Sequence, residues 1–364
     1  MWGILPTMRD YTIAVIPGDG IGNEVVPEAV RVLDAAAEIT ASYALRYEHF
    51  PWGCEYYLRH GQMMAKDGLD LLRPFDAIFF GAVGFPTVPD HISLRGLRLP
   101  ICQGFEQYVC YRPSVLLPGV ESPLAGKRPG DIDFVVIREN TEGEYAGVGG
   151  RAHLGLPIEV ALQTAVFTRT GVERILRYAF QLARRRRRRL VSATKSNALQ
   201  YSLTLWDEVA EAVGRDFPDV AMERVLVDAL AARFVLAPQA LDVVVASNLF
   251  GDILTDLGAA ICGSMGLAPS GNINPERDYP SMFEPVHGSA PDIVGKGIAN
   301  PIAQIESGAM MIEFLGEGAA ANLIVTAVRE VLTEGRALTP DLGGTARTSE
   351  VTEAVLAKMR AAAD

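Results

Sequence analysis

The chain has 364 residues, of which 49% are hydrophobic and 21% are charged, with a formal net charge of −11 at pH 7. This length exceeds that of a typical single core, so we expect a globular protein of two domains. The acidic balance argues against nucleic acid or a membrane surface as the main partner. A run of arginines at residues 184–189 is a local exception, for which a solvated helix end is favoured over a nucleic-acid patch.

The first predicted element is a strand at residues 11–16, followed by a glycine turn at residues 17–22 and a helix at residues 24–37. A strand, a glycine-rich turn and a helix in succession are typical of a dinucleotide-binding fingerprint. The spacing here is GxGxG rather than GxGxxG, and no acidic residue clearly ends a second strand where the ribose would need one. We therefore do not predict a Rossmann fingerprint, although backbone N–H groups at the turn can still face a ligand.

Strands and helices alternate along the next part of the chain. A strand at residues 76–81 is followed by an irregular segment at residues 85–100, and loops of this length are usually functional or disordered. The later strands are predicted at residues 134–137, 190–194, 222–227 and 243–246, and the helices between them at residues 172–183 and 203–213. This alternation predicts the α/β class.

The four cysteines form no CxxC pair and no disulfide framework, which favours reduced thiols in a cytosolic protein. No charged region followed by an apolar core opens the chain, so no signal peptide is predicted. The uncharged stretch at residues 257–275 contains glycines and prolines that break a helix, so it is not predicted to span a membrane. We expect a cytoplasmic protein.

The segment at residues 247–256 follows an apolar, β-branched strand. Ser247 and Asn248 can cap a helix that begins there. Asp252 and Asp256 then lie four residues apart on one helix face, where two like charges repel unless a cation lies between them. Mg²⁺ or Mn²⁺ with a chelating substrate suits such carboxylates. On this spacing alone, a pair of solvated surface acids is the simpler interpretation.

Polar residues repeatedly occur where a predicted strand ends, and open α/β sheets bind ligands at the carboxyl ends of their strands. Arg138 and Arg112 each supply a guanidinium for a carboxylate. Lys195 and Tyr145 are candidates for moving protons. Hard oxygen ligands for a metal come from Asp228, Asp252 and Asp256. Together these residues predict a site for a metal-chelated small acid with several carboxylates, although each one alone has an ordinary structural interpretation.

At this point the motifs identify a family. The chain resembles the metal-dependent β-decarboxylating dehydrogenases, which act on isocitrate, isopropylmalate, tartrate and D-malate. The resemblance covers nearly the whole chain and rests on the motifs at residues 16–22, 138–143, 247–256, 283–292 and 340–345. Within the family it is most similar to the tartrate and D-malate dehydrogenases, on the grounds of residues 54–57, 88–94 and 267–272.

The resemblance implies an isopropylmalate-dehydrogenase-like α/β fold of two domains without a Rossmann fingerprint. Residues 1–107 and 263–364 would form a large domain with the cofactor loop, and residues 108–262 a central domain with the dimer interface. The protein would be a homodimer with shared active sites, in which Lys195 and Asp228 reach the site of the partner.

The resemblance also implies the cofactors and the chemistry. NAD would lie along residues 283–300, on contacts from His287, Gly288, Asp292 and Asn300, and Mg²⁺ or Mn²⁺ would bind the aspartates, with K⁺ as a further ion. The substrate would be a 2-hydroxy dicarboxylic acid such as D-malate or tartrate, held by Arg112 and Arg138. Lys195 would take the hydroxyl proton and Tyr145 would protonate C3 after loss of CO₂.

The chain departs from the family in the loop that chooses the substrate. The family has an arginine ten residues before Arg112, where this chain has Cys102, followed by Gln103. Arg95 and Arg98 replace a tryptophan and a leucine, and each is a candidate for restoring the charge from another direction. The alternatives are therefore an isopropylmalate or isocitrate dehydrogenase, or a non-catalytic homologue that has lost substrate binding.

Overall fold

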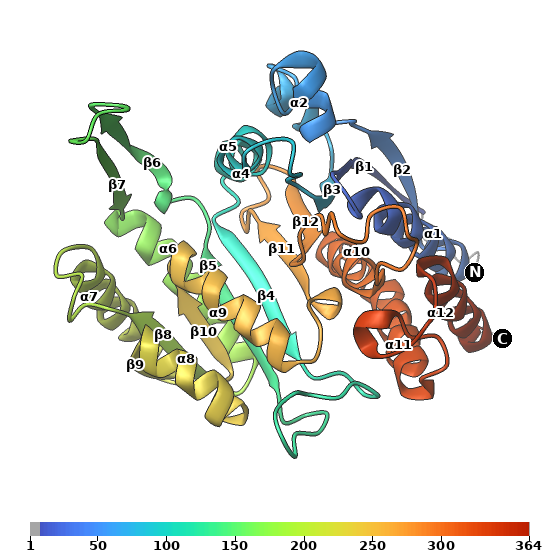
Figure 1. The fold of residues 1–364 in the computed structure, drawn as a ribbon. Helices are drawn as coiled ribbons and strands as arrows, with labels where there is room; N and C mark the ends of the chain where they lie inside the picture. Colours follow the sequence, from blue (N-terminus) through green and yellow to red (C-terminus); the bar gives the residue numbers. More distant parts are fainter. Residues whose placement is uncertain (1–7, 364) are drawn as a thin grey trace, which may run out of the picture.

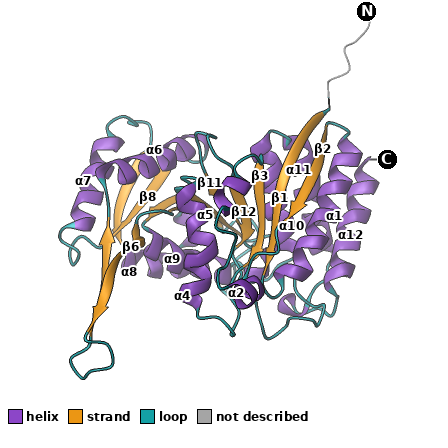
Figure 2. Ribbon diagram, turned by 90° about the horizontal axis from the view of Figure 1, so that it is seen from above, coloured by secondary structure: helices purple, strands orange, loops and turns teal. Residues whose placement is uncertain are grey.

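The computed structural model describes residues 8–363. It is an α/β protein built on one ten-stranded sheet with helices on both faces (Figures 1 and 2), which confirms the predicted class. In spatial order the strands are β2 (Tyr43–His49), β1 (Arg9–Gly18), β3 (Ala77–Ala82), β12 (Ser281–Pro285), β11 (Pro269–Ile273), β4 (Val109–Val115), β5 (Asp133–Glu139), β10 (Val243–Ala246), β8 (Arg189–Thr194) and β9 (Ala221–Leu226). A separate hairpin is made by β6 (Gly143–Ala152) and β7 (Val160–Val166).

Both faces of the sheet are covered because successive strand residues point to opposite sides. In β5, Val135 and Ile137 join one hydrophobic cluster while Phe134 and Val136 join another. The helices on the first of these faces, called the back face, are α1 (Gly22–Thr40), α6 (Arg169–Arg185), α7 (Ser202–Gly214), α10 (Ile302–Leu315), α11 (Gly318–Glu334) and α12 (Thr348–Ala363). On the other face, called the front face, are α2 (Cys54–His60), α3 (Gly68–Leu72), α4 (Asp90–Ser93), α5 (Leu99–Gly104), α8 (Val227–Leu236) and α9 (Asn248–Ile261).

The middle of the sheet is antiparallel, whereas its two ends are parallel. Strand β11 runs antiparallel to both β12 and β4, and β4 runs antiparallel to β5. The first and last parts of the chain supply β1–β3 with β11 and β12, and the central part supplies β5 and β8–β10. The predicted division into two domains, with boundaries at 107/108 and 262/263, stays a prediction. Residues 1–7 and 364 of the predicted large domain lie outside the described residues.

Two of the predicted elements need correction. The strand expected at residues 222–227 ends at Leu226, and Asp228 lies in the first turn of α8 rather than at a strand end. The segment expected to be irregular at residues 85–100 is helical from Asp90 onward, through α4, a π-helical turn (Leu94–Arg98) and the start of α5. Pro100 is compatible with this helical path because it lies in the first turn of α5, where a missing N–H costs nothing.

The glycine turn after β1 serves close packing of the backbone. Gly20 has a φ of 56°, and a Cβ there would lie 2.1 Å from the carbonyl oxygen of Ser289. The next amide, that of Ile21, donates to the same carbonyl at 2.9 Å. The turn therefore packs directly against the backbone at Ser289. This close contact requires a glycine at residue 20, so the glycine needs no dinucleotide fingerprint to explain it.

The arginine run ends helix α6, as the sequence predicted. Arg184 pairs with Asp219 at 2.6 Å, and Arg186 pairs with Asp133 at 2.7 Å and with buried Asp242 at 2.8 Å. The run therefore contributes to the packing of the helix end.

The four cysteines are buried and unbridged, and within residues 8–363 no helix is both long and apolar enough to cross a membrane.

Candidate active site

The candidate site is centred on Asp252 of α9, on the front face of the sheet. Arg138 of β5 donates from Nη1 to Oδ1 of Asp252 at 2.6 Å, and Arg112 of β4 donates from Nη1 to the same oxygen at 3.1 Å. Arg112 also donates to Oγ1 of Thr255 at 2.8 Å. The two arginines are 1% and 7% exposed. Two guanidiniums that were predicted separately therefore converge on a predicted metal ligand.

Local packing explains how Arg138 reaches Asp252. Ser247 caps α9, with its Oγ accepting from the amide of Phe250 at 3.5 Å, so the helix begins directly after β10. Gly251 lies one turn into the helix, and a Cβ there would lie 2.7 Å from Cγ of Arg138. The absence of a side chain at Gly251 allows the stem of Arg138 to cross the helix. Sequence reasoning did not single out this glycine.

The charges at the site are unequal for the two aspartates of α9. Burial raises the pKa of Asp252, but the guanidiniums of Arg138, Arg112 and Arg98 outweigh it and hold that pKa below the ordinary aspartate value. Burial and repulsion from Asp252 raise the pKa of Asp256. A cation bridging the two carboxylates would relieve this repulsion, so the pair fits a hard divalent ion.

Tyr145 lies beside the same guanidinium. Nη2 of Arg138 donates to the phenolic oxygen of Tyr145, and the guanidinium lies 5.3 Å from the centre of the ring. Gln103 donates from Nε2 to the carbonyl oxygens of Thr141 at 3.1 Å and of Tyr145 at 2.9 Å. The phenolic oxygen of Tyr145 accepts the hydrogen bond from Arg138, so the O–H of Tyr145 remains available to donate its proton to another group. Gln103 is a supporting residue that the sequence showed only as a departure from the family.

Lys195 and Asp228 form a separate pair. Nζ of Lys195 lies 2.6 Å from Oδ1 of Asp228, and the two side chains are 29% and 64% exposed. Across residues 8–363, no three His, Cys, Asp or Glu side chains are grouped so that they hold a metal ion. A single chain therefore brings Asp252 and Asp256 together but does not add Asp228 to them.

The predicted cofactor residues follow β12. His287 places Nδ1 3.0 Å from the carbonyl oxygen of Gly288, while its Nε2 is buried without a hydrogen-bond partner among the described residues. Burial lowers the pKa of this imidazole. Gly288 and Asp292 are exposed. The orphaned Nε2 and the open glycine beside it fit a ligand that stacks and hydrogen-bonds along this segment.

Asn300 differs from the other predicted cofactor residues because its side chain is already engaged. Its Nδ2 donates to Oδ2 of Asp341 at 3.0 Å, and its Oδ1 accepts from the amide of Ile302 at 3.0 Å. Ser264 also donates to Oδ2 of Asp341, at 2.6 Å. If the side-chain amide of Asn300 contacts a cofactor, it must do so while it also donates to Asp341. Sequence reasoning did not identify Asp341 as a neighbour of the cofactor segment.

The loop that departs from the family is buried rather than open. Cys102 and Cys110 are fully buried, and burial raises the pKa of the Cys102 thiol to about 12. Arg98 is 6% exposed and pairs with Glu284 at 2.7 Å. Arg95 is exposed and donates to the carbonyl oxygen of Glu144 at 3.3 Å. Cys102 is thus a neutral packing residue, and the buried charge nearby belongs to Arg98.

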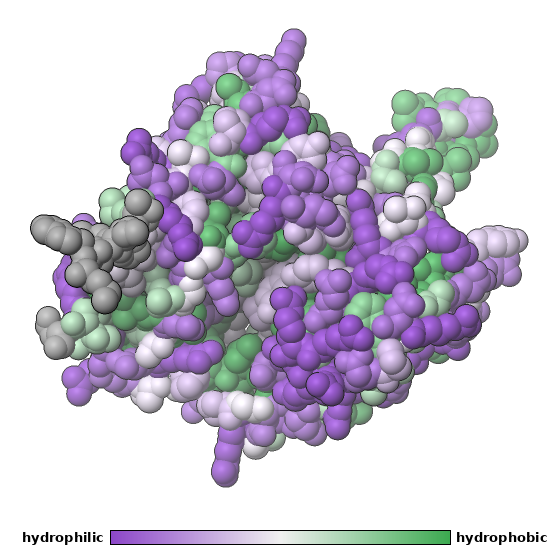
Figure 3. All heavy atoms as spheres, turned by 180° about the vertical axis from the view of Figure 1, so that it is seen from behind, coloured by the Kyte–Doolittle hydropathy of each residue, from purple (hydrophilic) through white to green (hydrophobic). Residues whose placement is uncertain are grey.

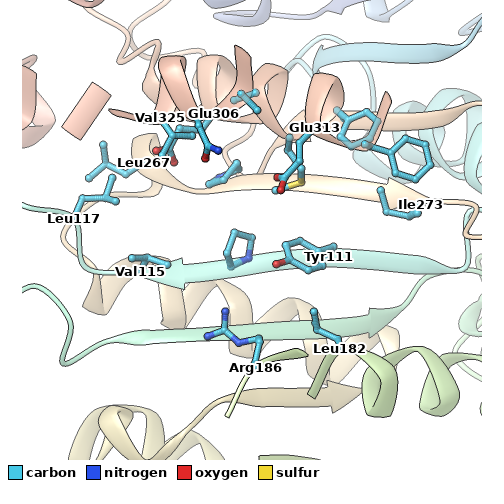
Figure 4. Close-up of a pocket in the computed structure, with 18 of the residues that line it drawn as sticks. Tyr111, Val115, Leu117, Leu182, Arg186, Leu267, Ile273, Glu306, Glu313 and Val325 are labelled. Carbon is cyan, nitrogen blue, oxygen red and sulfur yellow. The ribbon is translucent and has the colours of Figure 1, made fainter. Parts of the chain in front are cut away.

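The described part of the chain also has a groove on the other face of the sheet. A groove of about 580 Å³ runs along the back face of the sheet, and its floor includes Tyr111, Pro113 and Val115 of β4 (Figure 4). The intervening residue Arg112 points to the front face, toward Asp252. The groove and the candidate active site therefore lie on opposite faces of one strand.

Comparisons with known proteins agree with this arrangement. The model of the isocitrate/isopropylmalate dehydrogenase family matches residues 12–355. A probable tartrate dehydrogenase/decarboxylase of Agrobacterium vitis is 57% identical over 349 residues, covering 96% of this chain and 97% of the relative. The decarboxylating D-malate dehydrogenase of Escherichia coli strain K12 is 57% identical over 356 residues, covering 96% and 98%. The crystal structure of isocitrate dehydrogenase from Methylococcus capsulatus superposes with a TM-score of 0.86 at 37% identity, covering 96% of this chain and 99% of that chain.

Proposed function

The chain belongs to the isocitrate/isopropylmalate dehydrogenase family and is a decarboxylating dehydrogenase, and from that premise we propose that it acts on D-malate, tartrate or a related 2-hydroxy dicarboxylic acid. We propose NAD as the hydride acceptor and Mg²⁺ or Mn²⁺ as the metal. The names of the relatives at 57% identity support this substrate class over isopropylmalate or isocitrate. Membership among decarboxylating dehydrogenases also argues against the non-catalytic alternative.

The observation that supports this function most directly is the convergence of Arg112 and Arg138 on Asp252. Two buried guanidiniums meet at one oxygen of Asp252, so both are held at a point where a carboxylate substrate can accept further hydrogen bonds from them. Guanidiniums bind carboxylates through charge-assisted hydrogen bonds, which fix orientation as well as charge. A diacid bound here would lie directly beside the carboxylates of α9.

The side chains around the substrate divide the proton transfers between them. Tyr145 is oriented by the hydrogen bond from Arg138, so its O–H can give a proton to C3. Lys195 would take the proton of the substrate hydroxyl in the site of the partner subunit. Asp252 and Asp256 would hold a divalent ion, which would supply Lewis acidity at that hydroxyl. The segment of His287 and Asp292 would hold NAD, which would serve as the hydride acceptor.

A homodimer with shared sites is supported by exposed apolar side chains near the candidate site. The β6–β7 hairpin projects from the body of the protein and presents a hydrophobic surface (Figures 1 and 3). Leu154, Ile158 and Leu162 in and beside it are 67%, 64% and 67% exposed. On α9, Leu249 and Ile253 are 46% and 60% exposed. Burying such surface against a second copy is favourable, and it would bring Lys195 and Asp228 of one subunit near α9 of the other.

The test is a screen of NADH production with Mn²⁺ present. The substrates are D-malate, L-tartrate, meso-tartrate, isopropylmalate and isocitrate, each also assayed with EDTA in place of the metal. We expect turnover of D-malate or a tartrate that depends on the metal. Turnover of isopropylmalate or isocitrate alone would replace the proposed substrate class, and NADH production unaffected by EDTA would refute the role of the metal.

A further inference from the structure

Arg98 is a buried arginine for which the proposed mechanism has no role. It lies at the end of the π-helical turn that precedes α5 and is 6% exposed. Its Nε and Nη2 lie 2.8 and 2.7 Å from Oε1 of Glu284, and Nη2 also donates to Oδ1 of Asn272 at 2.9 Å. An arginine this deeply buried is costly unless it is paired and hydrogen-bonded, so its position is closely specified.

The sheet register places this network next to the candidate substrate site. Asn272 of β11 lies opposite Cys110 of β4, which lies opposite Arg138 of β5, so their side chains share the front face. Asn272 also donates to Oε1 of Glu284 on β12 at 2.7 Å. Asn272 therefore lies in the same row across the sheet as Arg138, and Glu284 lies diagonally beside it, opposite Ser270.

Arg98 places its charge beside the site. Its hydrogen-bond partner Asn272 shares the front face of the sheet with Arg138. Burial raises the pKa of Glu284, but Arg98 and Asn272 outweigh it, so Glu284 is the ionised partner of Arg98. The guanidinium of Arg98 thus joins those of Arg112 and Arg138 beside the carboxylates of Asp252, Asp256 and Glu284, and a substrate carboxylate would be a further acceptor for their N–H groups.

The hydrogen bonds of Arg98 leave one of its nitrogens available. Glu284 and Asn272 fix Nε and Nη2, whereas Nη1 has no acceptor among residues 8–363 and is not one of their buried unpartnered atoms. The same holds for Nη2 of Arg112, which binds Asp252 and Thr255 through Nη1 alone. Arg98 is therefore anchored through Nε and Nη2 and keeps Nη1 available, and Arg112 is anchored through Nη1 alone and keeps Nη2 available.

We propose that Arg98 is a third substrate-binding arginine, which holds the carboxylate remote from the substrate hydroxyl together with Arg112. Glu284 and Asn272 orient it, and it supplies from the π-helical turn the charge that residue 102 does not carry. This proposal rests on the proposed function, because it requires a substrate with a second carboxylate. A purely structural ion pair with Glu284 is the competing explanation.

The experiment compares the KM values for the diacid and for NAD in three variants. Arg98→Met removes the guanidinium, and Arg98→Lys keeps a cation beside Glu284. Arg98→Met combined with Glu284→Gln removes both charges of the buried pair, so it separates substrate binding from stability. Arg95→Met is the matched control, because Arg95 lies in the same turn and is exposed.

We expect Arg98→Met to raise the KM for the diacid about ten- to a hundredfold, as the loss of a charge-assisted contact predicts, and to leave the KM for NAD within about twofold. The double variant should keep the high KM even where its melting temperature returns to that of the wild type, and Arg98→Lys should show a smaller rise. Arg95→Met should match the wild type. A folded double variant with a wild-type KM for the diacid would show that Arg98 is only structural.

Calorimetry with succinate tests the same residue without turnover, since succinate has both carboxylates but no hydroxyl to oxidise. The wild type should bind succinate, and Arg98→Met or the double variant should bind it at least tenfold more weakly. Equal affinity in wild type and variants would overturn the proposal. If the wild type oxidises none of the diacids, the proposed function fails, and the succinate titration still decides whether Arg98 binds a dicarboxylate.

Discussion

The two faces of strand β4 have opposite chemical characters. On the front face, Arg112 is buried and bound to Asp252 and Thr255, with Arg138 beside it. On the back face, Tyr111 belongs to the floor of a groove of about 580 Å³ (Figure 4). The front face has several converging charges, whereas the back face has a large volume with a mainly apolar floor.

This difference shows that the size of a hollow does not locate the chemistry in this fold. Side chains from β4, β5 and α9 meet on the front face because residues two apart in a strand share a side. Glu306 and Glu313 line the back groove from α10, and among residues 8–363 no hydrogen bond or ion pair joins either of them to the arginines that line it. Changes on the front face should therefore alter metal binding and catalysis, and changes on the back face should alter stability alone.

The largest effect is expected for Asp252→Asn. Loss of the carboxylate removes a metal ligand and leaves the guanidiniums of Arg112 and Arg138 without their shared acceptor. We expect Mn²⁺ affinity to fall about a hundredfold, consistent with the loss of a charged contact in a buried site. Calorimetry with a substrate analogue present measures the effect, and Glu313→Gln in the back groove is the control. Unchanged Mn²⁺ affinity in Asp252→Asn would refute the ligand assignment.

The front face was only partly predictable from the sequence. Asp252 and Asp256 were recognisable from their spacing in a capped helix, and Arg112 and Arg138 from their motifs. The roles of Gly251 and Gln103 depend on contacts between segments that are distant in sequence, which no local pattern reveals. Asp228 was assigned to a strand end because the apolar run continues through Val227, although the helix already begins there.

Strand β4 illustrates why the fold was also incompletely predictable. Local patterns identified the strands that are buried on both faces, such as β10, as continuous apolar runs. In β4, Arg112 and Pro113 interrupt such a run, and proline is rarely found inside a sheet. It is tolerated because β11 pairs with β4 only at residues 109–111, so Pro113 lies beyond the end of that ladder. This pairing is a tertiary property.

A complementation experiment extends the comparison to the dimer. Lys195→Ala and Asp252→Asn should each be inactive, because each lacks one part of the proposed shared site. After subunit exchange, a heterodimer would contain one site with both residues intact, and an equal mixture should regain about a quarter of wild-type activity. Exchange is verified with differently tagged subunits. No recovery after verified exchange would place Lys195 and Asp252 in a site built within one chain.

A smaller effect is expected for Asp292→Lys in the cofactor segment. The carboxylate of Asp292 is exposed, where it can accept hydrogen bonds from ribose hydroxyls and repel a 2′-phosphate. We expect the wild type to prefer NAD, and the substitution to shift the ratio of kcat/KM values toward NADP about tenfold. The control is Asp278→Lys, an exposed acid outside the segment. An unchanged ratio would mean that Asp292 does not select the cofactor.

The smallest effect concerns Glu306 on the back face. It lines the groove from α10, and burial raises its pKa from 4.5 to about 7, an effect that Arg329 opposes only in part. Between these two values the folded state keeps a proton that the unfolded state has lost. The free energy of unfolding therefore decreases as the pH rises from about 4.5 to about 7, and above pH 7 the full penalty of the charged carboxylate applies.

Glu306→Gln should remove this penalty. The carboxyl group is partly exposed, so we expect a gain of about 1–2 kcal/mol in the free energy of unfolding at pH 8 and none near pH 4. Denaturant unfolding of variant and wild type at both pH values measures the difference. The kcat should not change, because Glu306 lies across the sheet from Arg112 and Asp252. A loss of turnover at unchanged stability would show that the back groove participates in catalysis, which would break the division between the two faces of β4.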